Sequence, residues 1–235
     1  MNVDTLLAAM PGLDRATATR YLPLMEAAMC EHKITNDSRA KMWLAQVGHE
    51  SVSLRYMEEI ASGAAYEGRK DLGNIYPGDG VKYKGRGPIQ LTGRANYTAA
   101  GQALGLDLVN HPELASNPDT GFRVSAWWWL THGLNEISDT NDVMAATRRI
   151  NGGYNGLSDR QARYARVKAL PRVTPDCVPA VAKPAAQPPK GDIAVAEMKD
   201  GRLEVFVETS AGEVLHRWNT TGGAWSGWSS LGTPG

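Results

Sequence analysis

Apolar residues recur at helical spacing over residues 3–30 of the chain. The repeating positions are Leu6, Leu7, Met10 and Leu13, followed by Leu22, Leu24 and Met25. Pro11-Gly12 interrupts the pattern, so we predict two helices, with Asp14 as the N-cap of the second.

The helical pattern continues to about residue 170. A capping cluster at 35–38 predicts a longer helix that runs through Trp43, Leu44 and Val47. Residues 61–88 are rich in glycine and predict a loop with short irregular pieces. Helical spacing returns at 95–104, 119–132, 140–150 and 158–169. Because strand signals are weak here, we predict one mainly α-helical domain over residues 1–170.

Three consecutive tryptophans, Trp127, Trp128 and Trp129, lie in the helix predicted over 119–132. Neighbouring helical residues differ by about 100° in direction, so the three cannot share one face. At least one is expected in the core, which leaves another for a substrate or domain contact.

The composition changes sharply after residue 170. Prolines spaced through residues 171–191 predict an extended, semi-rigid linker. From 192 to 235 the pattern turns to β, with apolar or alternating runs that begin at Ile193, Leu203 and Val214. Asp200-Gly201 and Ala211-Gly212 predict turns between them, and residues 225–232 can form a fourth strand.

This tail resembles one blade of the lectin-like β-propellers, whose blades end in a Trp-Ser-Gly-Trp type motif, here residues 225–228. The resemblance implies a cell-wall or carbohydrate-binding module, with Trp218, Trp225 and Trp228 available for sugar stacking or for the core of the blade. The chain has no second copy, and a sheet of about 40 residues buries little apolar surface. We therefore expect the tail to dock on the helical domain or to self-associate with other copies.

Charge and composition narrow the class of partner. The formal net charge is zero, 42% of residues are hydrophobic and 21% are charged, which fits a globular protein and gives no reason to expect nucleic acid. Seven basic residues crowd one segment: Arg148, Arg149, Arg160, Arg163, Arg166, Lys168 and Arg172. They predict either a solvated helix face or a surface that attracts an anionic polymer.

The two cysteines, Cys30 and Cys177, are too few for a disulfide framework and lie far apart, which favours a reducing compartment. The first residues show no basic and apolar signal segment, and no apolar run approaches the roughly 18–20 residues of a membrane span. We therefore expect a protein of the cytoplasm that does not insert into membranes.

Candidate chemistry gathers around residues 83–97. Their glycines and Pro88 require tight turns, and Gln90, Thr92 and Asn96 follow as neutral hydrogen-bonding groups. Carboxylates precede this stretch at Glu50 and at Glu58-Glu59. Carboxylates can move protons while amides and hydroxyls hold sugar hydroxyls and a water, so the pattern favours cleavage of a polysaccharide.

Four ordered motifs resemble the family 19 glycoside hydrolases, which include chitinases and many bacteriophage endolysins. The motifs are Gly-His-Glu-Ser (48–51), Tyr-Met-Glu-Glu (56–59), the 83–97 stretch and Ile-Asn-Gly-Gly (150–153). Residues 66–74 resemble the endolysin-like branch in particular. The resemblance covers roughly residues 35–170 and implies a lysozyme-like catalytic domain.

The resemblance also implies residue roles. Glu50 corresponds to the general acid, Glu59 to the general base, and Thr92 to the hydroxyl that fixes the attacking water. The residues implied in substrate binding are Gln90, Asn96, Tyr97, Asn151 and Arg160. Arg160 is implied to pair with the carboxylate network and to help keep the base ionised.

The spacing of the two glutamates sets a structural condition. On one straight helix, nine positions separate Glu50 from Glu59 by about 13.5 Å and half a turn. An inverting pair must lie about 6.5–9.5 Å apart across one bond. The helix must therefore end soon after Glu50, within residues 51–53. Trp43 and Val47 are expected to give Glu50 an apolar wall that keeps it protonated.

Several assignments remain open at this point. Glu58 and, more weakly, Glu67 are alternatives for the base. His49 is expected to pack structurally, because no His or Cys pair shows the spacing of metal ligands, and no metal or cofactor is expected.

These observations favour an endolysin that hydrolyses β-1,4 bonds between the aminosugars of bacterial peptidoglycan by an inverting single displacement. Such an enzyme would stay in the host cytoplasm until its release to the wall. A chitinase with the same residues is the first alternative, and a carbohydrate-binding protein with an inactive hydrolase domain is the second.

Overall fold

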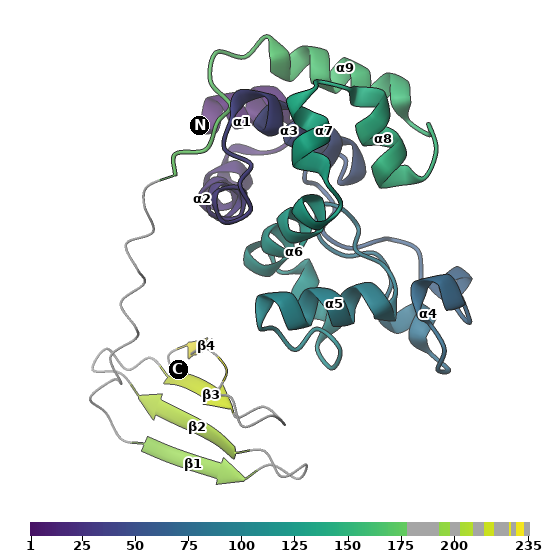
Figure 1. Cartoon of the computed structure of the whole chain (residues 1–235). Coiled ribbons are helices and arrows are strands. Elements are labelled where there is room, and N and C mark those ends of the chain that lie inside the picture. The colour runs from purple at the N-terminus through teal and green to yellow at the C-terminus, as the bar shows by residue number, and fades with distance from the viewer. Residues whose placement is uncertain (178–192, 198–202, 209–213, 219–225, 227–228, 233–235) are drawn as a thin grey trace. The chain divides into compact units, whose positions relative to one another are not determined.

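The computed structural model describes residues 1–177, 193–197, 203–208, 214–218, 226 and 229–232. The chain divides into two compact units, Met1–Cys177 and Val178–Gly235. The first unit is helical and the second contains a small sheet (Figure 1).

The helical unit follows the predicted order of elements. Its α-helices are α1 (Val3–Ala9), α2 (Arg15–Glu31), α3 (Asp37–Glu50), α4 (Asp79–Lys82), α5 (Arg94–Leu104), α6 (Pro118–Thr131), α7 (Leu134–Asp139), α8 (Val143–Asn151) and α9 (Leu157–Lys168). Short 3-10 turns are η1 (Ala64–Tyr66), η2 (Lys70–Leu72) and η3 (Pro112–Ser116). The mainly α-helical prediction is confirmed. Helix α7 was not predicted, because six residues give too little periodicity to recognise.

The predicted start signals of the first helices are confirmed. Gly12 adopts φ of 85° between α1 and α2, a left-handed conformation that glycine takes without a steric cost. The Asp14 side chain accepts a 2.8 Å hydrogen bond from the Thr17 N–H, and Asn36 caps α3 through the Arg39 N–H at 2.9 Å.

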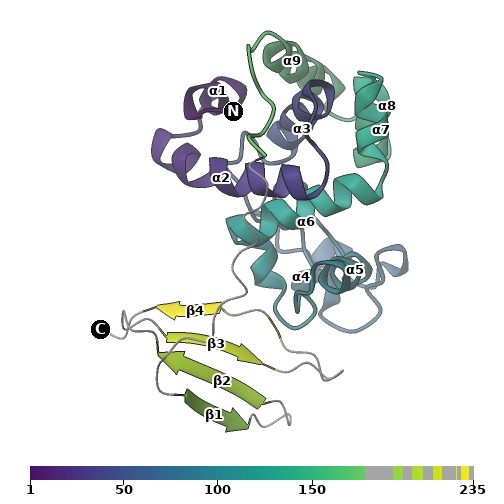
Figure 2. The same ribbon diagram turned by 60° about the vertical axis from the view of Figure 1, so that its left-hand side comes forward.

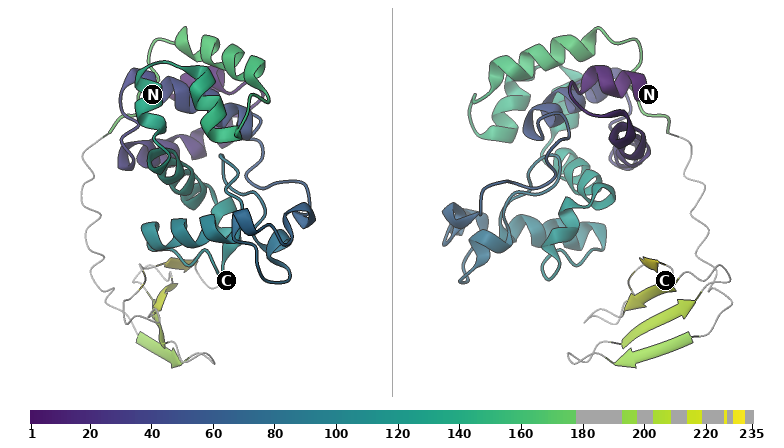
Figure 3. Two further views of the ribbon diagram at one scale, coloured as in Figure 1. Left: turned by 45° about the vertical axis from the view of Figure 1, so that its right-hand side comes forward. Right: turned by 180° about the vertical axis from the view of Figure 1, so that it is seen from behind.

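Two hydrophobic cores meet at α6. The larger one is formed mainly by α1, α2, α3 and α6 with contributions from α7, α8 and α9, and the smaller one surrounds Tyr83, Tyr97 and Leu108 near α5. In Figures 2 and 3, α6 lies between the group that contains α3 and α9 and the group that contains α4 and α5. Residues 51–93 connect the two groups, and the two candidate carboxylates, Glu50 and Glu59, lie close to the start of this connection.

The expected core residue among the three tryptophans of α6 is Trp129. Trp129 is fully buried in the larger core, with its ring centroid 5.3 Å from that of Trp43. Trp127 packs against the smaller core, and Trp128 packs against both. The row of aromatics therefore joins the two cores.

The glycine-rich loop over 61–88 is confirmed, with η1, η2 and α4 as its short pieces. The buried Asp79 organises it by pairing with Arg94 of α5 at 2.5 Å. The same carboxylate accepts hydrogen bonds from the N–H groups of Ile75 and Tyr76, each at 3.0 Å.

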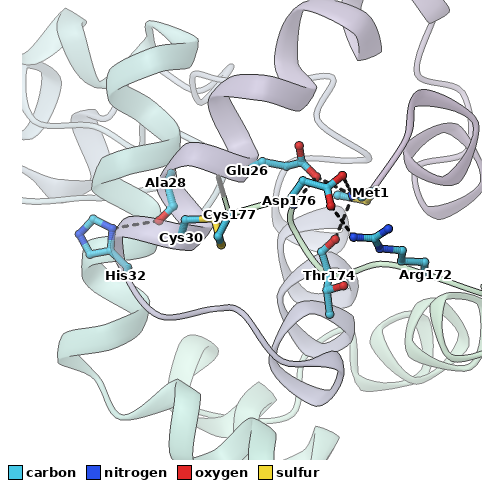
Figure 4. Close-up of a disulfide and its surroundings, with 9 residues drawn as sticks. All are labelled: Met1, Glu26, Ala28, Cys30, His32, Arg172, Thr174, Asp176 and Cys177. Atoms are coloured by element: carbon cyan, nitrogen blue, oxygen red, sulfur yellow. Dashed lines mark hydrogen bonds and ion pairs between the residues drawn. A yellow bond between two sulfur atoms is a disulfide. The ribbon is translucent and has the colours of Figure 1, made fainter. Parts of the chain in front are cut away.

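The two cysteines form a disulfide between Cys30 of α2 and Cys177 (Figure 4). This pairing contradicts our expectation of reduced cysteines. The two residues are 147 positions apart, so their proximity depends on how the end of the unit returns to α2, which local sequence patterns do not encode.

The N-terminal ammonium also holds residues 172–177 close to α2. Met1 donates to Glu26 at 2.7 Å and to the Thr174 carbonyl at 2.9 Å (Figure 4). Val173 is fully buried, and the compact unit extends through Cys177. The first residues of the predicted linker therefore belong to the helical unit.

The second unit contains a four-stranded antiparallel sheet in the order β1-β2-β3-β4. The strands are β1 (Ile193–Glu197), β2 (Leu203–Glu208), β3 (Val214–Trp218) and β4 (Ser229–Gly232). The β pattern of the tail is confirmed, and Val207 is buried. Trp225, Trp228 and residues 178–191 lie outside the described residues, so the resemblance to a lectin blade and the linker conformation stay predictions.

Among the residues described, no helix is both long enough and apolar enough to cross a bilayer.

Candidate active site

Helix α3 ends at Glu50, and the chain then passes through a left-handed turn. Val52, Ser53 and Leu54 adopt φ of 51°, 61° and 62°, a region that residues other than glycine rarely occupy. The Ser51 hydroxyl closes the helix end by donating to the Val47 carbonyl at 2.6 Å and accepting the Leu54 N–H at 2.8 Å. The predicted break within residues 51–53 is confirmed.

The Glu50 carboxylate is paired with Arg160 of α9. Only 1% of the Arg160 side chain and 18% of the Glu50 side chain are exposed. Trp43 and Val47 are fully buried in the larger core, and the apolar wall that they were expected to give Glu50 stays a prediction. Arg160, which was expected to support the base, is instead bound to the acid candidate.

Sequence reasoning missed Gln46, which completes this contact. Its Oε1 accepts a 2.5 Å hydrogen bond from Nη1 of Arg160, and its side chain is fully buried. Gln46 precedes Glu50 by one helical turn, so both project from the same face of α3. A polar residue within an otherwise apolar helical run was the signal that could have revealed it.

Glu59 is held by neutral hydrogen-bond donors. The Tyr66 hydroxyl donates to Oε1 at 3.0 Å, and the Gly85 N–H donates to Oε2 at 3.1 Å. The Glu59 N–H in turn donates to the Gly85 carbonyl at 2.9 Å. Burial and the hydrogen bond to Glu59 raise the pKa of Tyr66 above its usual value of 10.0, so its hydroxyl remains a donor at neutral pH.

The neighbouring Glu58 lies in a different environment. Its Oε1 contacts Nζ of Lys84 at 3.1 Å and Nη2 of Arg86 at 3.3 Å, and the Ser116 hydroxyl donates to Oε2 at 3.3 Å. Burial opposes ionisation, but the Lys84 hydrogen bond and the Arg86 charge outweigh it and lower the pKa of Glu58. Glu58 is thus engaged in a local salt-bridge cluster.

Glu67, the weaker alternative base, joins two parts of the glycine-rich loop. Its two carboxylate oxygens accept hydrogen bonds from the Gly78 N–H at 2.7 Å and the Gly80 N–H at 2.8 Å. This arrangement supports a structural role rather than proton transfer.

Gln90 lies beside Glu59 in a tight turn. A Cβ on Gly85 would lie 2.8 Å from Oε1 of Gln90 and 3.3 Å from Oε2 of Glu59. Gly85 therefore permits the close approach of the amide and the carboxylate. Gln90 itself adopts φ of 58°, and its amide nitrogen donates to the Gly87 carbonyl at 3.0 Å.

The side chains of Thr92 and Asn96 form hydrogen bonds with the backbone of the segment that begins at Gln90. The Thr92 hydroxyl donates to the Gln90 carbonyl at 2.9 Å, and the Asn96 amide donates to the Thr92 carbonyl at 2.8 Å. Because the Thr92 hydroxyl donates its proton to this carbonyl, its oxygen can only accept a hydrogen bond from a further group. Gln90 therefore lies beside Glu59, and Thr92 and Asn96 are bonded to the backbone that follows Gln90.

Comparison of the chain with protein-family models identifies its family. A family model described as chitinase class I matches residues 26–164, more than half of the chain and a span that includes every residue placed above. The chain belongs to glycoside hydrolase family 19.

Individual relatives of this family 19 hydrolase agree with the assignment. The chain is 32% identical over 171 residues to a family 19 domain-containing protein of Haemophilus influenzae, and the match covers 60% of this chain and 82% of that protein. It is 32% identical over 162 residues to acidic endochitinase SP2 of Beta vulgaris, covering 66% of this chain but only 56% of that enzyme. The chain thus spans little more than half of the plant enzyme.

A solved structure supports the fold. A bacterial family 19 chitinase matches with a TM-score of 0.59 and 26% identity, covering 74% of this chain and 96% of that one. The lysozyme-like fold class is confirmed, and the protein is a glycoside hydrolase.

In this family 19 hydrolase, Tyr97 does not form part of the exposed site. Its side chain is fully buried, and its hydroxyl donates to the Lys84 carbonyl at 2.8 Å and accepts from Arg86 at 3.2 Å. Burial raises the pKa of Tyr97 to about 12, although Arg86 opposes the shift. The expectation that Tyr97 binds the substrate is therefore wrong, because the ring belongs to the smaller core.

Asn151 is the last residue of α8, and it is exposed. Gly152 follows at φ of 75° and ends the helix, which leaves the Asn151 side chain available to a ligand.

His49 pairs with Asp159 of α9 at 2.7 Å, so its predicted structural packing is confirmed. Within the described part of the chain, no group of three His, Cys, Asp or Glu residues could hold a metal ion.

Proposed function

We propose that this family 19 hydrolase cleaves β-1,4 bonds between the aminosugars of bacterial peptidoglycan by inversion, with Glu50 as general acid and Glu59 as general base. One observation carries the proposal. Helix α3 ends at Glu50 in a left-handed turn, and the two carboxylates on either side of that turn have different surroundings. A buried cation holds Glu50, whereas neutral donors hold Glu59.

Proton donation is the role that the resemblance to the family implies for Glu50. In the reaction, its carboxyl gives a proton to the glycosidic oxygen as the bond from that oxygen to the sugar C1 breaks. The carboxyl then becomes an anion, and the guanidinium of Arg160 lies in contact with its Oε1. Arg160 therefore stabilises the charge that forms on the acid during the step.

Activation of water is the role that the Glu59 surroundings favour. Hydrogen bonds from the Tyr66 hydroxyl and the Gly85 N–H orient the Glu59 carboxylate. The carboxylate takes a proton from a water as the water oxygen bonds to C1 on the face opposite the leaving group. The lone pairs of Thr92 can accept the second hydrogen of that water. Solvent then exchanges the protons of the two carboxyl groups back to the starting state.

Peptidoglycan is our first choice of substrate because residues 66–74 resemble the endolysin-like branch. The segment is also part of the site, since it supplies Tyr66 to Glu59. Chitin is the second candidate, favoured by the names of the relatives, which include the endochitinase of Beta vulgaris and the bacterial chitinase of the solved structure. Both polymers carry N-acetylglucosamine, so the acid and base alone do not separate them.

We propose that the tail sheet binds the wall polymer and raises the local concentration of the hydrolase on it. Trp218 is partly buried and its ring lies 5.4 Å from that of His216, in a row of rings that continues to Phe206. Such rings can stack on sugars. Unchanged wall binding after deletion of residues 178–235 would contradict this role.

Digestion of purified peptidoglycan and of colloidal chitin tests the substrate, with Glu50→Gln as the control for contaminating activity. Mass spectrometry of the products would show which sugar carries the new reducing end. Proton NMR during the first minutes tests the mechanism, because inversion of a β bond releases the α anomer first. Clearing of chitin alone would reverse the ranking of substrates. A first product in the β form would contradict inversion, and no turnover of either polymer would favour a binding protein with an inactive hydrolase domain.

A further inference from the structure

A buried polar chain connects α3 to α9 directly behind the proposed acid. Nη2 of Arg160 contacts Oε1 of Glu50, and Nη1 donates to Oε1 of Gln46 at 2.5 Å. Arg160 and Gln46 are both fully buried. One guanidinium therefore bridges two residues that lie one turn apart on the same helix face.

The contact with Arg160 defines the orientation of the Gln46 amide. Its oxygen faces a guanidinium N–H, which can only donate, so its nitrogen must face the other way. That nitrogen lies 3.5 Å from Oγ1 of Thr147 in α8 and 3.8 Å from Sδ of Met42. Nε of Arg160 is buried without a hydrogen-bond partner. The guanidinium thus depends on Gln46 and Glu50 for its orientation.

We propose that Gln46 is a positioning residue for proton transfer, which fixes the plane of the Arg160 guanidinium and through it the direction of the Glu50 carboxyl. The inference rests on the proposed function and deepens it. Gln46 is too deeply buried to touch a substrate, so it acts through Arg160. A neutral amide suits this role because it orients the guanidinium without competing for its charge.

The other charged groups at this contact between α3 and α9 pair among themselves. Asp159 accepts from Nε of Arg163 at 2.7 Å and pairs with Nδ1 of His49 at 2.7 Å. Arg163 also donates to the Ser53 hydroxyl at 2.9 Å and so holds the left-handed turn. These groups are the same in every variant below, so differences between variants report on Gln46.

Two substitutions of Gln46 separate positioning from packing. Gln46→Met keeps the volume but removes the acceptor, and we expect kcat to fall at least about tenfold while KM changes less than about threefold. Gln46→Glu restores an acceptor but competes for the charge of Arg160. We expect it to recover part of kcat and to move the alkaline limb of the kcat/KM profile to higher pH, because the anion formed on Glu50 is then less stabilised.

Thr147→Val is the matched control, because it removes the distant partner of the Gln46 amide and leaves the contact to Arg160. We expect its kcat to stay within about twofold of the wild type. Melting temperatures measured for each variant show that the assays compare folded proteins. A kcat for Gln46→Met within about threefold of the wild type, or an unshifted profile for Gln46→Glu, would overturn the proposal.

A double variant tests the route of the effect. If Gln46 acts only through Arg160, then Gln46→Met adds no further loss of kcat to Arg160→Met, whereas additive losses would contradict the proposal. A crystal structure of Gln46→Met gives a readout that does not depend on turnover. We expect the guanidinium to turn away from Glu50, and an unmoved guanidinium would overturn the inference even if the wild-type protein hydrolysed neither polymer. Absence of wild-type turnover would instead count against the proposed function.

Discussion

The hydroxyl of Tyr66 donates a 3.0 Å hydrogen bond to the carboxylate of Glu59, although the two residues come from separate parts of the connection between the cores. The contact ties the loop that contains η1 to the carboxylate that we propose as the base. Residues 66–74, which resemble the endolysin-like branch, therefore contact the proposed base through Tyr66.

Replacement of Tyr66 tests this contact. Tyr66→Phe removes one donor to Glu59, so the carboxylate loses part of its orientation. We expect kcat to fall about 5- to 50-fold at neutral pH, with a smaller change in KM. Tyr76→Phe, in the same loop and exposed, is the matched control and should keep wild-type kinetics. Equal kinetics for the two variants would remove Tyr66 from the site.

The choice between the adjacent glutamates follows from their partners. Glu59→Gln should lower kcat by about 10²–10⁴-fold, because the amide cannot accept the proton of the water. Glu58→Gln should lower kcat less than about fivefold but reduce the melting temperature, because it weakens the cluster with Lys84 and Arg86. Steady-state kinetics and thermal melts of both variants check this. The larger loss of kcat in Glu58→Gln would exchange their roles.

The disulfide between Cys30 and Cys177 should stabilise the helical unit without taking part in catalysis. The pairing closes 147 residues, and its removal should cost on the order of 3–5 kcal/mol in the free energy of unfolding. We expect the double variant Cys30→Ser, Cys177→Ser to melt at a lower temperature and to retain kcat at 25 °C. Dithiothreitol should lower the melting temperature of the wild type and leave that of the double variant unchanged. Two free thiols in the unfolded, unreduced protein would contradict the pairing.

The stability of the loop over 61–88 should depend on pH through Asp79. The hydrogen bond from Arg94, opposed by burial, lowers the pKa of Asp79 below its ordinary 3.8. A carboxyl with a lowered pKa in the folded state stabilises the fold above its unfolded pKa and loses that contribution as pH falls through the folded value.

We therefore expect Asp79→Asn to be less stable than the wild type by about 2–4 kcal/mol from pH 7 to 5, and the difference to shrink below about pH 4. Denaturant unfolding at several pH values measures it. Asp71→Asn, which removes an exposed carboxylate paired with Arg69, should change stability little at any pH. A difference for Asp79→Asn that did not vary with pH would contradict the role assigned to its charge.

The sequence predicted those features that local chemistry determines. Ser51, Val52 and Ser53 continue a helix poorly, and the spacing of Glu50 and Glu59 required the helix to end there, as it does in the structure. Family 19 membership and the helical fold also followed from ordered motifs and periodicity.

Features that depend on distant packing did not follow from the sequence. Arg160 turned out to contact Glu50 rather than the base, because the packing of α9 on α3 decides which carboxylate it reaches. Tyr97 had the same local pattern as a sugar-binding aromatic, but the turn at 83–93 covers it and buries it. The cysteine pairing likewise required the return of residues 172–177 to α2.

The most direct test of the central claim is the turnover of Glu50→Gln on purified peptidoglycan, measured beside a melting curve of the same sample. Glutamine keeps the shape of the side chain and can still contact Arg160, but it cannot donate a proton to the leaving oxygen. We predict a kcat about 10²–10⁴-fold below the wild type with a cooperative melt. A folded variant that kept more than about 10% of wild-type kcat would contradict the assignment of Glu50 as the acid.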